Sequence, residues 1–321
     1  MTQYSMLQKK DIQGILSKYD LDLLSYGPID QGEGSSTYLL RTEKKQFVLT
    51  VFEIERIRVV NICKLLGLLE EYKFPTTRVY KPANGDAVTS YHGKPVIIKS
   101  YIPGQVMDVL DEDMIKQVGT AMAELHQIPY PDYLQDRHAY GLHTFSDVMK
   151  SGIDHEYESW LAGRLIHLKE WIPAGLPRGL IHGDVFRDNV LFVGKTFRAL
   201  IDFEDACQYY RVFDLGMAVV GMCTKNLQIE LPKVRSLVEG YQSLSILEQK
   251  EKESLQLFVE YAAIATSSWR FWKYNIHTPI AEKAEKHMEM VNIANNTRAI
   301  PKGEFWDSVF VGKSRESARD Y

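Results

Sequence analysis

Hydrophobic and polar residues follow two different patterns along the chain, and the change comes near Tyr101. Before that residue, short apolar runs with the alternation of half-buried strands are separated by polar turns. The pattern predicts a lead-in helix over 5–19, a loop around 26–29, strands at 38–42, 46–52, 87–91 and 95–101, and a helix over 59–72. Together these elements predict a small lobe of mixed α and β structure.

After Pro103 and Gly104, apolar residues recur at helical spacing. The pattern there predicts helices over 113–127 and 156–171, and one long helix or a pair of helices over 252–275. Two apolar runs at 190–193 and 198–201 are the exception, because they flank a turn and predict a β-hairpin. The second part of the chain is therefore expected to be mainly helical around one hairpin.

Composition supports two lobes in an ordinary globular protein. The chain has 321 residues, of which 45% are hydrophobic, which is enough to bury a sizeable core. We expect an N-terminal lobe over 1–101 and a C-terminal lobe over 102–321, with a loose, charged tail at 313–321. The 38 basic and 42 acidic side chains give a net charge of -4 and form no basic stripe. Nucleic acid and anionic membrane surfaces are therefore unexpected partners, and a small molecule is the expected one.

The cysteines and the apolar segments indicate a cytoplasmic protein. Cys63, Cys207 and Cys223 are odd in number and widely spaced, which predicts neither a disulfide framework nor a zinc site. Residues 1–10 lack the order of a signal peptide, and no apolar stretch approaches the roughly 18 residues of a membrane span.

The most informative segment reads Leu-Ile-His-Gly-Asp-Val-Phe-Arg-Asp-Asn-Val-Leu-Phe over 180–192, and Asp202 follows in Leu-Ile-Asp-Phe. It resembles the catalytic loop of eukaryotic-like kinases. Such chemistry needs a carboxylate that accepts or orients the substrate hydroxyl proton, here Asp184. It also needs hard oxygen ligands that hold Mg²⁺ against nucleotide phosphates, here Asn189 and Asp202.

The details resemble the aminoglycoside phosphotransferase and choline kinase group more than protein kinases. His-Gly-Asp replaces His-Arg-Asp, Glu204 stands where a protein kinase has glycine, and no Ala-Pro-Glu activation segment is present. Asp214 in Phe-Asp-Leu-Gly matches the aspartate that braces the catalytic loop in this group, and His182 is expected to position the same loop. The resemblance implies a two-lobed, protein-kinase-like α+β fold with a β-rich N-lobe and a helical C-lobe.

Flanking strings resemble type II homoserine kinases over roughly 32–272. They include Phe-Val-Leu-Thr at 47–50, Pro103-Gly104, the Leu125-His126 pair and Arg-Phe-Trp at 270–272. The resemblance implies an ATP- and Mg²⁺-dependent transfer to L-homoserine, which yields O-phospho-L-homoserine for threonine biosynthesis.

The resemblance also implies positions for the nucleotide. A glycine-rich loop is expected to cover the phosphates with backbone N–H groups, and the strand end near the hinge to meet adenine. The nucleotide-binding candidates are Gly32, Gly34, Ser35, Ser36, Thr50, Lys64, Ser100 and Ile102.

Thr50 stands where the phosphate-pairing lysine is expected. A non-catalytic nucleotide-binding relative is therefore an alternative. The homoserine kinases look the same at this strand, and we hypothesise that Lys64 on the following helix supplies the charge.

Acceptor recognition is open at this stage. Arg187 is a candidate for neutralising the transferring phosphoryl group. Homoserine has a carboxylate and an ammonium group, for which Arg270 and Glu204 or Asp205 are the candidates. Alternative acceptors are choline, ethanolamine, hydroxylysine and an aminoglycoside. The aromatic residues that form either core or a cage for a quaternary ammonium are Tyr209, Tyr210, Trp269, Phe271 and Trp272.

Overall fold

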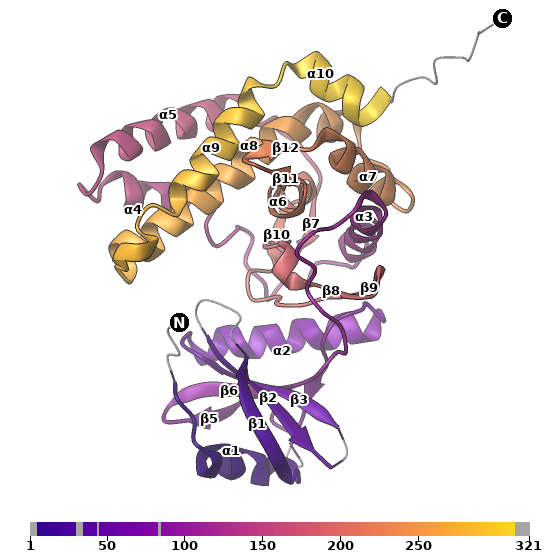
Figure 1. Ribbon diagram of the computed structural model, residues 1–321, viewed down its shortest axis with the longest axis vertical. Helices are drawn as coiled ribbons and strands as arrows, with labels where there is room; N and C mark the ends of the chain where they lie inside the picture. Colours follow the sequence, from indigo (N-terminus) through magenta and orange to yellow (C-terminus); the bar gives the residue numbers. More distant parts are fainter. Residues whose placement is uncertain (1–4, 30–34, 44, 83–84, 312–321) are drawn as a thin grey trace, which may run out of the picture. The chain divides into compact units, whose positions relative to one another are not determined.

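The computed structural model describes residues 5–29, 35–43, 45–82 and 85–311, and the chain divides into two compact units (Figure 1). The first unit comprises Met1–Gln105, Leu191–Val193 and Arg198–Glu204. The second comprises Val106–Val190, Gly194–Phe197 and Asp205–Tyr321. The predicted hairpin thus contributes residues to both units. Glycine-rich loop residues Gly32 and Gly34 and the tail over 313–321 lie outside the described residues.

The first unit is built on one antiparallel sheet in the order β1-β2-β3-β6-β4, with β5 also paired to β6. Its elements are α1 (Lys9–Leu16), β1 (Leu23–Ile29), β2 (Ser35–Thr42), β3 (Gln46–Phe52), α2 (Arg56–Glu71), β4 (Val79–Tyr80), β5 (Thr89–Tyr91) and β6 (Lys94–Ser100).

The two faces of this sheet are covered by different helices (Figure 1). On one face, Leu49 and its register partner Ile98 belong to a buried cluster with Ile12 and Leu16 of α1. Thr50 and its partner Ile97 have the opposite orientation, because side chains alternate along a strand. They share their face with α2, whose buried residues Val59, Ile62, Leu65, Leu66 and Leu69 lie on one side of that helix.

The prediction of a loop around 26–29 is wrong, because these residues form the end of strand β1. This strand is mostly exposed and contains Gly27 and Pro28, two residues that suppress a strand pattern. Pairing along one side with β2 is enough to hold it at the sheet edge.

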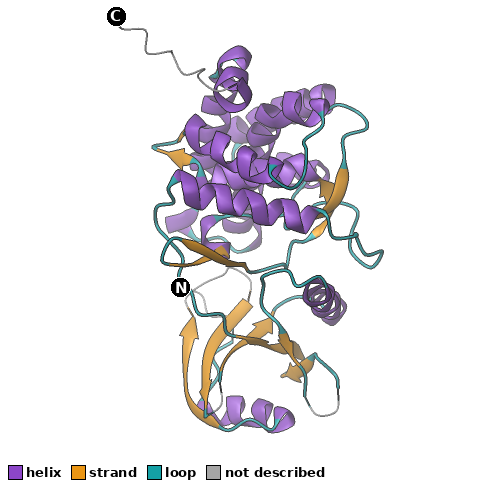
Figure 2. Cartoon of the chain, turned by 90° about the vertical axis from the view of Figure 1, so that its right-hand side faces the viewer, coloured by secondary structure: helices purple, strands orange, loops and turns teal. Residues whose placement is uncertain are grey.

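The second unit is mainly helical (Figure 2). Its principal helices are α3 (Glu112–His126), α4 (Phe145–Met149), α5 (His155–Trp171), α6 (Arg211–Met222), α7 (Leu231–Gln242), α8 (Gln249–Phe271), α9 (His287–Ala299) and α10 (Lys302–Trp306). Its strands are β7 (Arg178–Ile181), β10 (Cys207–Tyr210), β11 (Thr224–Lys225) and β12 (Gln228–Ile229), and the hairpin β8 (Val190–Val193) and β9 (Thr196–Leu200) follows β7.

Small residues let helices of the second unit approach at backbone distance. A Cβ on Gly119 of α3 would lie 2.1 Å from the Leu237 carbonyl oxygen of α7. On the α7 side, a Cβ on Gly240 would lie 1.9 Å from the Lys116 carbonyl oxygen. The contact brings the C-terminal end of α3 into the core, where it carries His126.

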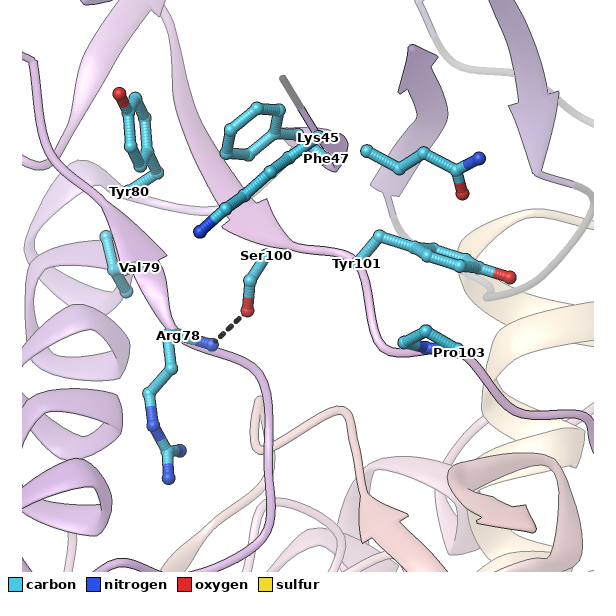
Figure 3. Close-up of a pocket in the computed structure, with 9 residues that line it drawn as sticks. Lys45, Phe47, Arg78, Val79, Tyr80, Ser100, Tyr101 and Pro103 are labelled. Carbon is cyan, nitrogen blue, oxygen red and sulfur yellow. Dashed lines mark hydrogen bonds between the residues drawn. The ribbon is translucent and has the colours of Figure 1, made fainter. Parts of the chain in front are cut away.

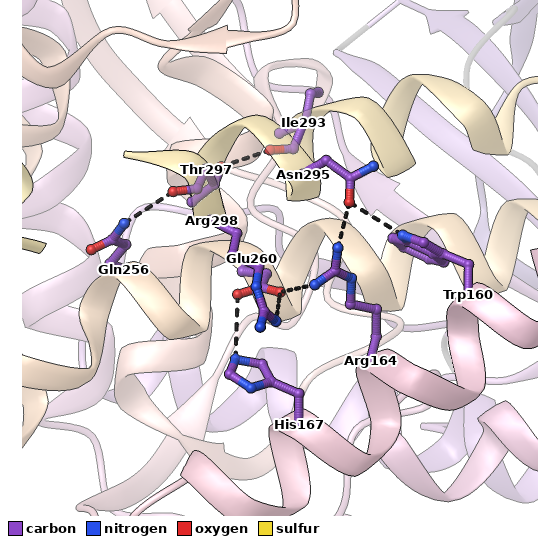
Figure 4. Close-up of polar contacts among 9 residues, drawn as sticks. All are labelled: Trp160, Arg164, His167, Gln256, Glu260, Ile293, Asn295, Thr297 and Arg298. Atoms are coloured by element: carbon purple, nitrogen blue, oxygen red, sulfur yellow. Dashed lines mark hydrogen bonds and ion pairs between the residues drawn. The ribbon is translucent and has the colours of Figure 1, made fainter. Parts of the chain in front are cut away.

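A buried ion-pair cluster ties α8 to its neighbours (Figure 4). The Glu260 side chain is 4% exposed and faces Arg164 of α5 at 3.5 Å and Arg298 of α9 at 3.4 Å. Burial raises the pKa of Glu260, against the two guanidinium groups that lower it. Together these pairs hold α5 and α9 against α8.

The segment over 252–275, predicted as one long helix or a pair of helices, forms two consecutive helical segments. α8 stops at Phe271 and continues as a π-helical segment, Trp272–His277. No helix among the described residues has the length and apolar character needed to cross a membrane. The three cysteines are free thiols.

Candidate active site

The loop that follows β7 is fixed at its start by a carboxylate from α6. Asp214 is fully buried and accepts the backbone N–H of His182 at 2.9 Å and of Gly183 at 2.8 Å. Burial alone would raise the pKa of Asp214, but the hydrogen bond from His126 and the nearby His182 hold it below its ordinary value. The brace therefore stays ionised.

His126 supplies the third contact to this carboxylate. Its Nε2 lies 3.1 Å from Asp214 Oδ2, and its Nδ1 lies 2.9 Å from the hydroxyl of Tyr241 in α7. Burial raises the pKa of Tyr241 to about 12, so its hydroxyl keeps its proton at neutral pH. The Nε2–H of His126 donates to Asp214, which lowers the pKa of that carboxyl. Helices α3, α6 and α7 thus meet at the base of the loop.

Only glycine is suited to the position before Asp184. Gly183 has a φ of 87°, in the region that side chains other than glycine rarely adopt. A Cβ there would lie 2.6 Å from the Asp205 carbonyl oxygen and 3.0 Å from Nε2 of His138. The chain after β7 therefore turns tightly between Asp205, which precedes β10, and the loop that carries His138.

Asp184 and Asn189 are in direct contact. The Asn189 Nδ2 donates to Oδ2 of Asp184 at 3.0 Å and to its backbone carbonyl oxygen at 2.9 Å. The N–H of Asp184 donates to Nδ1 of His182, which is fully buried. Because Nδ2 is turned toward Asp184, the Asn189 Oδ1 is directed elsewhere and is available as a metal ligand.

Two residues from a distant segment complete the surroundings of Asp184. The Tyr140 hydroxyl donates to Oδ1 of Asp184 at 3.1 Å, and Nε2 of His138 lies 2.9 Å from the Gly183 carbonyl oxygen. Burial lowers the pKa of His138 to about 4, so the ring is neutral near pH 7 and donates its Nε2–H to that carbonyl.

Asp202 follows β9 and is described within the first unit. It has a φ of 68°, which is strained for a residue other than glycine. Its Oδ1 is buried and has no hydrogen-bond partner among the described residues. A buried carboxylate oxygen without a donor is unfavourable unless a cation binds it, so Asp202 fits a Mg²⁺ ligand. The described residues contain no cluster of three or more acidic, histidine or cysteine ligands, so such an ion would take further ligands from phosphate and water.

The predicted phosphate-loop residues that are described open strand β2. Ser36 is buried, and its Oγ accepts the N–H of Ser5 at 2.8 Å. Ser35 pairs with Phe52 across the sheet. Both follow residues 30–34 in the chain, which lie outside the described residues.

Two residues bear on the missing lysine: Thr50 on β3, which stands at its position, and Lys64 on α2, which is predicted to supply the charge. Thr50 is 1% exposed, and its Oγ1 has no hydrogen-bond partner among the described residues. Lys64 is exposed on α2, the helix that shares the Thr50 face of the sheet. Both roles remain predictions.

The segment after β6 borders a hollow of about 750 Å³ (Figure 3). Ser100, Phe47 and Tyr80 line it from the face opposite Thr50, and Tyr101 and Pro103 close its end. The Ser100 N–H already donates to the backbone carbonyl oxygen of Arg78, the residue before β4, at 2.7 Å. The hollow therefore lies on the other face of the sheet from Thr50. Ile102 lies beyond the end of β6 and remains a predicted adenine contact.

The predicted acceptor-side residues lie in different surroundings. Arg187 is exposed and donates to the Asp108 carbonyl oxygen at 3.0 Å. Glu204 and Asp205 are half-buried after Phe203. Arg270 pairs with Glu289 of α9 at 2.5 Å, so its guanidinium is already occupied by a carboxylate.

The aromatic residues considered for a cage are mostly separated. Phe271 is buried against Tyr157, with ring centroids 4.6 Å apart, and Trp272 stacks on His277. Trp269 alone lies beside Tyr140, at 6.1 Å between ring centroids. The core interpretation therefore holds for Phe271, and the five residues do not form one cage.

Sequence reasoning missed His138 and Tyr140. They lie in a loop without periodicity, and nothing in their spacing connects them with the segment over 180–192. His126 was present in the quoted Leu125-His126 pair, but its contact with Asp214 depends on how α3 and α6 pack.

Curated relatives that match most of this chain are named homoserine kinases. The chain is 28% identical over 279 residues to a homoserine kinase of Rhizobium etli, which covers 82% of this chain and 85% of that protein. A homoserine kinase of Phenylobacterium zucineum is 28% identical over 292 residues, covering 86% of this chain and 87% of that protein.

Solved structures share the fold. An amicoumacin kinase structure with AMP-PNP, Ca²⁺ and amicoumacin has a TM-score of 0.73 at 12% identity and covers 91% of this chain and 94% of its own. A microcompartment-associated aminopropanol kinase has a TM-score of 0.68 at 18% identity, covering 94% and 100% of the two chains. The predicted kinase-like α+β fold is confirmed. The model of the phosphotransferase enzyme family matches residues 25–243, and the chain belongs to that family.

Proposed function

We propose that this phosphotransferase moves the γ-phosphoryl group of ATP to the hydroxyl of L-homoserine and forms O-phospho-L-homoserine. The observation that carries the chemistry is the partly exposed Asp184 carboxylate, held through both oxygens by Tyr140 and Asn189. A carboxylate fixed in this way is suited to orienting a substrate hydroxyl and accepting its proton during direct transfer.

Two oxygen ligands complete the phosphoryl-transfer machinery. Asn189 and Asp202 would hold Mg²⁺, which supplies charge neutralisation for the nucleotide phosphates when bound. Arg187 contributes positive charge near the same loop, where negative charge develops on the transferring group. The exposed position of Arg187 lets its guanidinium exchange the Asp108 carbonyl for a phosphate oxygen.

The nucleotide is assigned to the Thr50 face of the first unit. In this proposal, backbone N–H groups of Gly32, Gly34, Ser35 and Ser36 cover the phosphates and Ile102 borders adenine. The predicted adenine contact at Ser100 is not retained, because its side chain lines the opposite face and its N–H bonds to the Arg78 carbonyl oxygen. The buried Oγ1 of Thr50, which has no hydrogen-bond partner within the described part of the chain, supports this face over the opposite one. Lys64 would provide the cation that β3 lacks.

Homoserine as the acceptor is supported by relatives of that name, which match most of the chain at 27–28% identity. Its ammonium group is assigned to Glu204 or Asp205, and its carboxylate to Arg270. Production of O-phospho-L-homoserine would place the enzyme in threonine biosynthesis.

One observation favours a second candidate acceptor, a hydroxylated amine without a carboxylate. Arg270 already pairs with Glu289, so binding a substrate carboxylate would require that ion pair to open. Ethanolamine, choline and aminoglycosides, which lack a carboxylate, are therefore included as test substrates, together with hydroxylysine, which has one.

The test measures ADP release by the purified chain with Mg-ATP and each acceptor, beside Asp184→Asn. Asp188→Asn is the matched control, because it changes an exposed aspartate of the same loop. Turnover with L-homoserine that Asp184→Asn lowers to a small residual rate and Asp188→Asn retains is expected. The homoserine methyl ester should be a poor substrate, because it lacks the carboxylate.

Each other result has a defined meaning. Turnover with an amine that lacks a carboxylate would refute homoserine and keep the mechanism. ATP binding without turnover on any acceptor would support the non-catalytic alternative raised by Thr50.

A further inference from the structure

Tyr140 lies in the loop between α3 and α4, far along the chain from the segment over 180–192. Its side chain is 8% exposed, and its ring is packed on two sides. The His138 ring lies 4.2 Å away in a T-shaped arrangement, and the Trp269 ring of α8 lies 6.1 Å away. These neighbours leave the ring little freedom, so the direction of the hydroxyl is fixed by packing.

The hydroxyl has a single proton and two acceptors within reach. Asp184 Oδ1 lies at 3.1 Å and the Gly183 carbonyl oxygen at 3.4 Å. The carboxylate oxygen is the shorter contact and the stronger acceptor because it carries charge. Burial and the nearby negative charge of Asp184 raise the pKa of Tyr140 well above its ordinary value, so the hydroxyl remains a donor at neutral pH.

The contact matters because the last torsion of an aspartate is soft. The carboxylate of an aspartate rotates over a broad range unless hydrogen bonds restrict it. Asn189 holds Oδ2 from one side of the loop, and Tyr140 holds Oδ1 from another segment of the chain. The two donors together define the plane of the carboxylate.

We propose that Tyr140 is a positioning residue for phosphoryl transfer, whose hydroxyl fixes the orientation of the Asp184 carboxylate toward the acceptor hydroxyl. This inference rests on the proposed role of Asp184. Tyr140 approaches Asp184 from outside the loop over 180–192, so its hydroxyl is a donor independent of that loop's own conformation.

The test is Tyr140→Phe, which keeps the ring between His138 and Trp269 and removes only the hydroxyl. We expect kcat to fall about 10- to 100-fold, the range produced by small misplacements of catalytic groups. The KM values for ATP and acceptor should change less than about twofold, because ground-state binding does not use this hydroxyl.

Tyr157→Phe is the matched control. Tyr157 is also buried, and its hydroxyl shares a hydrogen bond with Ser267 at 2.8 Å. It loses a buried hydrogen bond of similar kind and should retain the wild-type kcat. Unfolding midpoints of both variants separate any loss of folding from loss of positioning.

A double-mutant cycle tests whether Tyr140 acts through Asp184. Adding Tyr140→Phe to Asp184→Ala should lower the residual kcat by less than about twofold, since the acceptor of the hydroxyl is already gone. The inference is overturned if Tyr140→Phe alone keeps the wild-type kcat, or if its loss is the same in both backgrounds. Lack of turnover by the wild-type protein on every acceptor would instead refute the proposed function, and this role with it.

Discussion

Acidification should destabilise the second unit through His138. The side chain is fully buried, and burial lowers the pKa of its imidazole from 6.5 to about 4, against the opposing effect of the Gly183 carbonyl. The unfolded chain therefore binds a proton at a pH where the folded chain does not, and stability falls as the pH drops below 6.5. The loss is complete once the pH passes below about 4, where the folded state is also protonated.

The size of the effect follows from the two pKa values. Between pH 7.5 and pH 5, linkage gives a loss of about 2 kcal/mol in the free energy of unfolding from this group alone. His138→Gln removes the titration and retains an N–H that can reach the Gly183 carbonyl. Other buried histidines titrate in both proteins and cancel in the comparison.

Urea unfolding at pH 5, 6, 7 and 7.5 measures the difference between wild type and His138→Gln. Wild type should lose about 2 kcal/mol more than the variant between pH 7.5 and pH 5. His155→Gln, which changes a histidine whose side chain is 89% exposed, should follow wild type. Equal pH dependence of wild type and His138→Gln would refute the assignment of a neutral, buried His138.

Three substitutions test the packing that holds the loop. Gly119→Ala should lower the free energy of unfolding, measured by urea titration, by about 2 to 4 kcal/mol, because its Cβ would overlap a carbonyl of α7. Gly163→Ala on the exposed side of α5 is the control and should raise the free energy of unfolding by about 0.5 to 1 kcal/mol. Gly183→Ala combines a left-handed φ with overlap at Asp205, so kcat should fall at least about tenfold and stability by about 2 to 4 kcal/mol. Asp214→Asn should lower the free energy of unfolding by about 3 kcal/mol and also lower kcat, because an amide nitrogen cannot accept a backbone N–H. Wild-type values in these assays would contradict each prediction.

The sequence predicts those elements whose patterns are local. Helix α3 is amphipathic and was expected within a residue of its bounds, and the β8–β9 hairpin has a tight turn between apolar runs. Helix α6 was not predicted, because nearly all its residues are buried and no polar face marks a helical period. Strand β1 was missed for the opposite reason, since it is mostly exposed.

The candidate site divides in the same way. Asp184 and Asn189 belong to one short segment, so their spacing alone predicts that both side chains meet. Tyr140 and His138 reach this segment only after the loop between α3 and α4 packs against it. Arg270 was selected by residue type, and the ion pair with Glu289 depends on α9, which no sequence pattern connects to α8. Long-range pairings of this kind require the packed structure.

Two aspartates flank the same turn, and their surroundings separate a structural role from a chemical one. Asp214 is fully buried and receives three donors, from the N–H groups of His182 and Gly183 and from His126. Protonation of the Asp214 carboxylate would weaken the hydrogen bonds that hold the loop, so Asp214 is unsuited to taking up a substrate proton. Asp184 is partly exposed, and Tyr140 and Asn189 donate to its two oxygens, which orients the carboxylate. The fully buried carboxylate of Asp214 therefore holds the loop, and the partly exposed one is the group proposed for the chemistry.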